Sequence, residues 1–225
     1  LSGLIHWRNI FLIPGIFGLI LCLHVSWWLP SFKPVEKKFR MNYIAAFRNK
    51  AILNIFSYIF LISLIYHGVQ QWLAVYFSSQ FHFAQFTISM LITLTSLSGI
   101  FGEIMGGWLS DALGRFKTIN LGIILMIVSA FALILKAPLV LLAAIVVIWG
   151  LGWTINHAGV STMLTDLPQS SLNEAASLNS GVRFISGGLG AALGGLFIEQ
   201  SFILNFIIFG FGLILLALFA KQMLR

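Results

Sequence analysis

The chain has 225 residues, of which 59% are hydrophobic and only 8% charged, and its formal net charge is +7. Ordinary soluble domains carry about a quarter of charged residues, so the composition excludes that class and predicts an all-α, polytopic membrane helix bundle. A positive net charge is also typical of nucleic-acid binding, but most Lys and Arg residues fall in gaps between apolar stretches rather than on one amphipathic face. The charge therefore indicates membrane topology, and no nucleic-acid partner is expected.

Seven apolar stretches come close to the length of about 20 residues that crosses a bilayer as a helix. Cys22, in the first stretch, is the only cysteine, which excludes an intrachain disulfide and a cysteine-rich metal site. The first stretch has no basic n-region before it and is too long for a signal-peptide core. Leu1 is not an initiator methionine, so we expect a piece of a longer polypeptide. The stretches are 9–29, 51–77, 86–110, 118–135, 138–165, 174–198 and 201–220.

The gaps between these stretches differ in charge. Residues 30–50 form the longest hydrophilic gap and are rich in Lys and Arg, whereas the next gap, 78–85, holds neither. Loops rich in Lys and Arg stay in the cytoplasm. We therefore expect an integral plasma (inner) membrane protein with the N-terminus of the chain outside and the C-terminus in the cytoplasm.

The stretches 86–110 and 174–198 are unusually rich in glycine. Pairs spaced four residues apart, such as Gly102 and Gly106 or Gly190 and Gly194, let two helix backbones approach closely where lipid gives no hydrophobic driving force. Ordinary helix packing explains any single pair. Two helices this rich in glycine also agree with surfaces that pack tightly and yet slide or rock.

A charged turn interrupts the apolar sequence between the third and fourth stretches. Its sequence is GGWLSDALGRFK. Gly114 permits a tight reversal of the chain, and Arg115 and Lys117 hold the turn at the anionic inner leaflet. Asp111 needs a partner, which is either Arg115 or the positive end of a neighbouring helix. The turn is therefore a candidate latch.

This turn resembles motif A of the major facilitator superfamily of secondary transporters, G-x-L-x-D-x-x-G-R. Two positions depart from the family pattern, since Ala112 follows the aspartate where a basic residue is usual and Phe116 replaces a second cation. In the family the motif lies in a cytoplasmic loop and serves as a gating turn. The matching residues are Gly107, Leu109, Asp111, Gly114 and Arg115.

The resemblance implies half of a twelve-helix major facilitator fold. Residues 1–29 then match the last helix of the N-terminal half, 30–50 the cytoplasmic basic loop, and 51–225 the six-helix C-terminal transport half. HWRNIFLIPG and NEAASLNSGVRFISGGLGAALGG are similar to the drug:proton antiporter branch. The other half is expected in the same chain or as a partner polypeptide.

The function implied by the resemblance is secondary active transport of a small molecule across the lipid bilayer, by proton-coupled efflux and alternating access. A proton gradient takes the place of a cofactor, and no metal is expected. A substrate importer of the same superfamily, or a non-transporting membrane receptor or scaffold, remains an alternative. The chain contains neither H-E-x-x-H nor G-x-S-x-G, so an enzyme is not expected.

Two charged residues stand out deep inside predicted spans, where a charge costs about 2.5–3.5 kcal/mol on insertion scales and so marks a functional candidate. By the helical rise, Glu103 lies about 12 Å inward from Asp111, and Arg183 about 13 Å into its helix from Glu174. If their helices line one cavity, Glu103 and Arg183 can pair, and substrate or proton can compete for that pair. A static pair, a partner in the other half, or snorkelling of the charge are the alternatives.

Polar residues inside two further spans are candidates for lining a central cavity, because the resemblance places both spans around it. A histidine there can titrate near physiological pH and relay protons. The alternative is that hydrogen bonds between helices satisfy these groups. The candidates are His67, Gln70 and Gln71, with His67 and Gln71 on one helical face, and Asn156 and His157.

Overall fold

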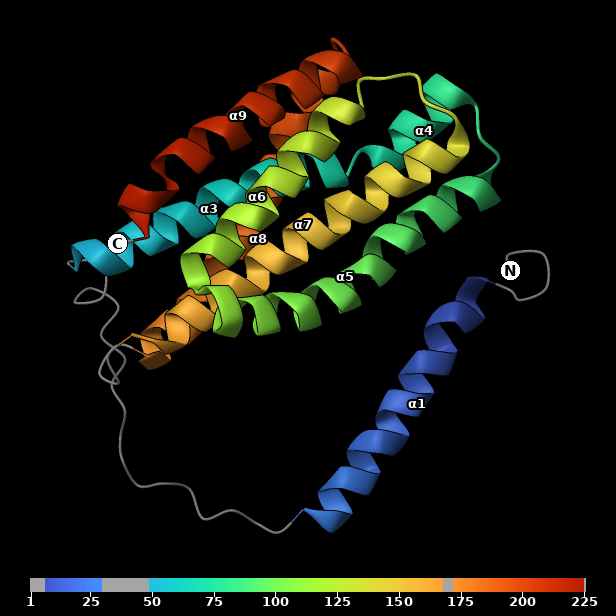
Figure 1. The fold of residues 1–225 in the computed structure, drawn as a ribbon. Helices are drawn as coiled ribbons and strands as arrows, with labels where there is room; N and C mark the ends of the chain where they lie inside the picture. The colour runs from blue at the N-terminus through green and yellow to red at the C-terminus, as the bar shows by residue number, and fades with distance from the viewer. Residues whose placement is uncertain (1–6, 30–48, 168–171, 225) are drawn as a thin grey trace. The chain divides into compact units, whose positions relative to one another are not determined.

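The computed structural model describes residues 7–29, 49–167 and 172–224. The chain divides into two compact units, Leu1–Arg40 and Met41–Arg225. The described part of the first unit, residues 7–29, forms the helix α1 (Trp7–Trp28) (Figure 1). The second contains α3 (Lys50–Gln70), α4 (Leu73–Phe81), α5 (Gln85–Leu113), α6 (Arg115–Ala132), α7 (Leu139–Thr165), α8 (Leu172–Ile198) and α9 (Phe202–Met223).

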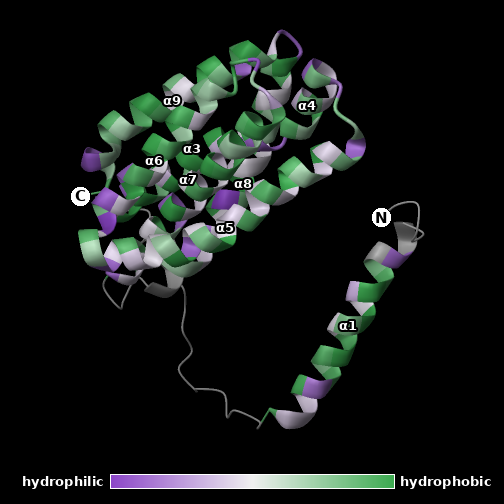
Figure 2. Cartoon of the chain, turned by 45° about the vertical axis from the view of Figure 1, so that its right-hand side comes forward, coloured by the Kyte–Doolittle hydropathy of each residue, from purple (hydrophilic) through white to green (hydrophobic). Residues whose placement is uncertain are grey.

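All regular elements in the described ranges are helices, and seven spans are long and apolar enough to cross a membrane. Hydrophobic residues cover the bodies of the helices, whereas hydrophilic residues gather towards their ends (Figure 2). The predicted all-α membrane bundle with seven spanning segments is therefore confirmed. The predicted basic loop, 30–50, lies almost wholly outside the described residues.

One predicted span differs from the structure. The apolar stretch 51–77 predicts one helix, but α3 ends at Gln70 and α4 begins at Leu73 within a single membrane span. The amide of Trp72 donates to the Val69 carbonyl at 3.1 Å, and the Gly68 carbonyl instead accepts from Asn205 Nδ2 at 3.2 Å. A side chain of α9 thus takes the place of one helical hydrogen bond, which explains the break.

Helices pair by close contact of glycines in the second unit. A methyl group added at Gly190 or Gly194 of α8 would collide with backbone carbonyls of α3, and one added at Gly106 of α5 would meet Ala158 Cβ of α7 at 2.7 Å. The close approach predicted from the glycine spacing is confirmed for α3 with α8 and for α5 with α7. That these surfaces slide stays a prediction.

The glycine contact between α3 and α8 predicts a contrast between two alanine substitutions on α8. Gly190→Ala places Cβ against the Leu64 carbonyl, whereas Gly181 is exposed with nothing within 4 Å of an added Cβ. Overpacking of this kind costs about 1–3 kcal/mol. Thermal unfolding in detergent should therefore show a lower melting temperature for Gly190→Ala than for the unsubstituted protein. The melting temperature of Gly181→Ala should not be lowered in this way. Equal melting temperatures would contradict the close contact.

Candidate functional site

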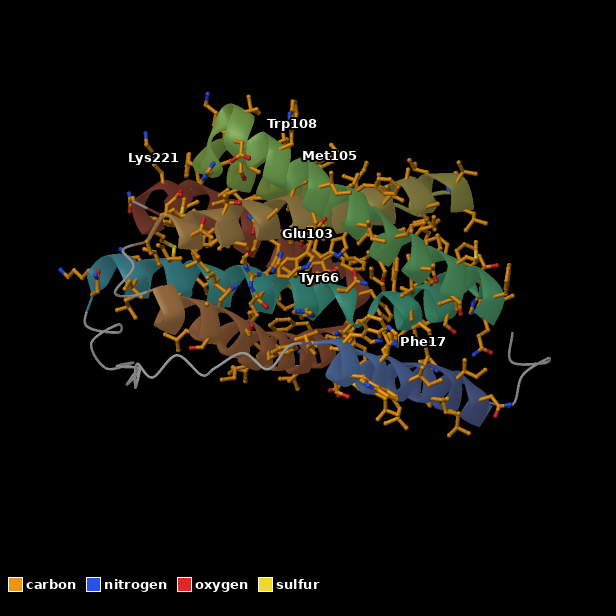
Figure 3. The ribbon with its side chains drawn as sticks, turned by 90° about the horizontal axis from the view of Figure 1, so that it is seen from below. Phe17, Tyr66, Glu103, Met105, Trp108 and Lys221 are labelled. Carbon is orange, nitrogen blue, oxygen red and sulfur yellow. The ribbon has the colours of Figure 1, made fainter. Side chains whose placement is uncertain are left out.

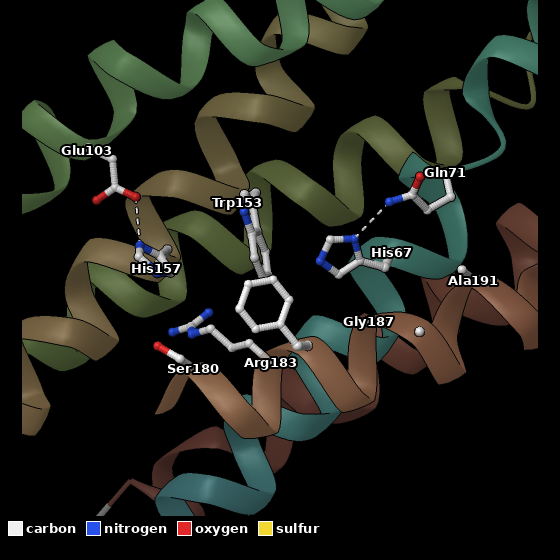
Figure 4. Close-up of a pocket in the computed structure, with 11 residues that line it drawn as sticks. His67, Gln71, Glu103, Trp153, His157, Ser180, Arg183, Gly187 and Ala191 are labelled. Atoms are coloured by element: carbon white, nitrogen blue, oxygen red, sulfur yellow. Dashed lines mark hydrogen bonds and ion pairs between the residues drawn. The ribbon is translucent and has the colours of Figure 1, made fainter. Parts of the chain in front are cut away.

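A cavity of about 530 Å³ opens within the second unit, with walls from α3, α5, α7 and α8 (Figure 4). The wall from α8 combines glycine and alanine with a serine, an arginine and a phenylalanine, and the other walls carry polar and aromatic side chains. The cavity is lined by His67, Gln71, Glu103, Trp153, His157, Ser180, Arg183, Phe184, Gly187, Gly188 and Ala191.

Glu103 and His157 form a hydrogen-bonded pair on one side of this cavity. The carboxylate Oε1 of Glu103 lies 2.7 Å from Nδ1 of His157, and their side chains are 45% and 32% exposed. Arg183, the candidate partner of Glu103, lines the same cavity, but among the described residues the hydrogen-bond partner of Glu103 is His157. The reason is packing, because α5 lies along α7 while α8 lies along α3.

Arg183 has a different set of contacts. Its Nε donates to Oδ1 of Asn179 at 2.9 Å, and its Cζ lies 5.6 Å from the ring centroid of Trp153. Its Nη1 and Nη2 are buried and have no hydrogen-bond partner among the described residues. Unpaired buried donors of a charged group are costly, so these two nitrogens are polar groups that the described residues leave unsatisfied.

A stack of three aromatic rings supports the cavity. The ring of Tyr66 lies between two tryptophans of α7, at 4.0 Å and 7° from Trp153 and at 5.4 Å and 14° from Trp149. Trp149 Nε1 also donates to Gln70 Oε1 at 2.9 Å. Gln70 therefore holds the stack and does not line the cavity, which corrects its predicted role. No local pattern in the sequence marks Tyr66 or Trp153 as part of the site.

His67 and Gln71 lie on one face of the chain, at the break between α3 and α4. Gln71 Nε2 lies 3.5 Å from His67 Nδ1, and both line the cavity. Trp153 is near both histidines of the site, with its ring centroid 5.9 Å from that of His67 and 6.2 Å from that of His157. The two polar pairs thus flank a single tryptophan (Figure 4).

The structure also corrects the prediction that Asn156 lines the cavity. Its side chain is fully buried and donates through Nδ2 to the hydroxyl of Tyr58 and to the carbonyl of Ile119. It therefore joins α7 to α3 and α6, as the alternative of inter-helix hydrogen bonding expects. His157, the next residue, is turned by about 100° around the helix and lines the cavity instead.

The charged turn joins α5 to α6 through Gly114, whose φ of 90° suits glycine. Of the two partners expected for Asp111, the structure shows Arg115, with Nη1 3.0 Å from Oδ1. Arg115 Nε also lies 3.1 Å from Oδ2 of Asp166, which follows the last turn of α7. The sequence did not predict Asp166 as a partner of Arg115, because no local pattern connects two positions that are 51 residues apart. A Cβ added at Gly107 would meet nothing within 4 Å.

Comparison with known proteins extends these observations. The family model described as Major Facilitator Superfamily matches residues 1–195. The purine ribonucleoside efflux pumps NepI of Salmonella typhimurium (strain LT2), Salmonella typhi and Salmonella paratyphi A (strain ATCC 9150) are each 25% identical over 219 residues, covering 96% of this chain and 54% of the pump. The chain therefore spans about half the length of the curated relatives it matches.

The contrasting positions of neighbouring Asn156 and His157 can be tested by cysteine labelling. In a background without Cys22, His157→Cys should react readily with a small water-soluble maleimide in the native protein, because this side chain lines the cavity. Asn156→Cys should react only after denaturation, because the side chain is 0% exposed. Equal labelling rates in the native protein would place Asn156 on the cavity after all.

Proposed function

The chain belongs to the major facilitator superfamily, and on this premise we propose that it forms the C-terminal half of a secondary active transporter that exports a small molecule in exchange for protons. The observation that carries the proposal is the cavity among α3, α5, α7 and α8, which holds an arginine and a carboxylate–histidine pair. Ionisable groups inside membrane spans mark substrate and proton pathways.

A second half, in the same polypeptide or in a partner, completes the cavity in this proposal. The chain covers only 54% of the length of its relatives. Met105 and Trp108 of α5 point away from the bundle (Figure 3) and are 46% and 68% exposed. An added Cβ meets nothing within 4 Å at Gly107 or Gly181, so these small residues leave room for another helix to approach. Rocking of the two halves about the cavity then provides alternating access.

The Glu103–His157 pair is the proposed proton site. A carboxylate and an imidazole 2.7 Å apart can pass a proton from one to the other across their hydrogen bond. Both side chains are partly exposed to the cavity that also contains Arg183. Substrate bound there changes the charge and hydration around the pair, and protonation of the pair changes the affinity for substrate. Linkage of this kind is reciprocal and is what coupled exchange requires.

The distribution of Lys and Arg supports an orientation in which the N-terminus of the chain lies outside and the charged turn in the cytoplasm of the inner membrane. Arg115 then ties the cytoplasmic ends of α5, α6 and α7 together through Asp111 and Asp166. Exposed ion pairs contribute little net stability. They can therefore break and form again during a transport cycle.

The proposed substrate class is purine ribonucleosides, the class named for the relatives. Trp153 and Phe184 supply aromatic side chains to the cavity, and Gln71, His67 and Ser180 supply hydrogen-bonding groups. Aromatic walls with a few polar groups are typical of small-molecule sites.

Replacement of Glu103 tests the proposed coupling. In everted membrane vesicles that contain the whole polypeptide, Glu103→Gln should reduce proton-driven accumulation of a purine ribonucleoside to the level of empty vesicles, because the pair loses its titratable carboxylate. Exchange of internal for external nucleoside at equal pH should continue, because the amide side chain of the variant still fills the site.

The matched control for this experiment is Glu199→Gln, which removes an exposed acid at the end of α8 outside the cavity and should leave accumulation unchanged. Unaltered accumulation by Glu103→Gln would contradict the coupling role. Nucleoside movement in the same direction as protons would identify an importer instead.

A further inference from the structure

We propose that a second cavity, at the end of the bundle opposite the charged turn, binds the headgroup of an anionic phospholipid through the side chain of Lys136. This Lys136 cavity has a volume of about 310 Å³ and shares no lining residue with the first cavity, among α3, α5, α7 and α8. Binding of lipid there does not depend on the proposed transport function. Its position, its charge and its hydrogen-bonding groups all fit a phospholipid headgroup.

The Lys136 cavity lies where membrane spans end. Lys136 is in the connection that follows α6, and Gln80 is in the last turn of α4. Gln200 and Ser201 join α8 to α9. Because α6 begins at Arg115, directly after the charged turn, its other end lies across the membrane span from that turn (Figure 1). The cavity therefore lies at the level where the hydrocarbon core of a bilayer gives way to the polar headgroups.

The helices α6 and α9, which flank the Lys136 cavity, lie away from the first cavity. They pack against each other and supply none of the residues that line the first cavity. Large apolar side chains stay exposed on both helices, and Ile203, itself 50% exposed, continues this apolar surface into the Lys136 cavity. Surfaces of this kind mark membrane contact, so a lipid reaches the cavity without leaving the bilayer. The exposed residues include Ile124, Val128, Phe211 and Leu215.

The charge of the Lys136 cavity complements an anionic lipid. Lys136 is its one charged lining residue in the described part of the chain and has no ion-pair partner there. Glu199 is exposed and does not line the cavity. Lysine binds phosphate as a point charge, and a phosphodiester carries one negative charge. A zwitterionic headgroup would add a second cation beside Lys136, so an anionic phospholipid is favoured.

Neutral donors accompany Lys136 in the cavity. The side-chain amides of Gln80 and Gln200 each carry two N–H donors. Ser201 Oγ accepts a hydrogen bond from the amide of Ile203 at 3.1 Å, which leaves its O–H to donate to a ligand. These donors suit the oxygens of a phosphate group. Phe81 and Ile203 line the same cavity and suit the glycerol backbone and the first methylene groups of the lipid.

The test is stabilisation of the whole polypeptide in neutral detergent by dioctanoyl phosphatidylglycerol. A ligand that binds only the folded protein raises its melting temperature as its concentration increases, which gives an apparent dissociation constant. This constant should be about fivefold higher or more for dioctanoyl phosphatidylcholine, because a lysine near an anionic headgroup contributes about that factor. No stabilisation by phosphatidylglycerol, or equal constants for the two lipids, would overturn the proposal. Equal stabilisation by inorganic phosphate would identify a soluble anion as the ligand and overturn the lipid.

Substitutions assign the effect to the Lys136 cavity. Lys136→Gln should raise the dissociation constant for phosphatidylglycerol about fivefold, and Lys136→Arg should keep it low. Lys221→Gln removes the same charge from the opposite end of α9 and should leave the constant unchanged. Glu199→Gln removes an acid outside the cavity and should not weaken binding. An unchanged constant in Lys136→Gln, or an equal rise in Lys221→Gln, would overturn the assignment to this cavity.

Discussion

The close contacts of glycines between α3 and α8 and between α5 and α7 are the constraint on which the rest of the structure depends. Where lipid gives helices no hydrophobic reason to associate, packing of small residues is what holds them together. Gly190 and Gly194 bring α8 against the backbone of α3, and Gly106 brings α5 against α7. These two tight pairs provide the opposing walls of the cavity, which opens where their contact with each other is looser.

The charges of the cavity follow from this pairing of helices. Because α5 lies along α7, Glu103 finds His157 on the neighbouring helix at 2.7 Å. Arg183, on the other pair, is left with Asn179 of its own helix and two nitrogens that have no hydrogen-bond partner in the described parts of the chain. A charge inside a membrane span is costly unless it is paired or used. In the proposed function, the Glu103–His157 pair serves as the proton site and Arg183 as a contact for the ligand.

The sequence predicted the spanning helices, the close glycine contacts and the reversal at Gly114, because each depends on a local pattern of apolar length, small-residue spacing or backbone freedom. It did not predict the break after Gln70, which depends on Asn205, 137 residues away from Gly68. Both Asn156 and His157 were predicted to line the cavity, but only His157 does so. The two residues are neighbours, and the rotation of α7 about its axis decides which of the two side chains faces the cavity. In the absence of any periodic polar face on α7, that rotation is set by tertiary packing alone.

The central claim is that substrate and protons share one cavity through the Glu103–His157 pair and Arg183. The most direct measurement is the change in pH when inosine is added to the purified whole polypeptide in weakly buffered detergent solution. The account predicts release of protons that saturates together with nucleoside binding and is lost in Glu103→Gln. Saturable binding of inosine with no release of protons at any pH between about 5 and 8, the range in which histidine ordinarily titrates, would contradict it.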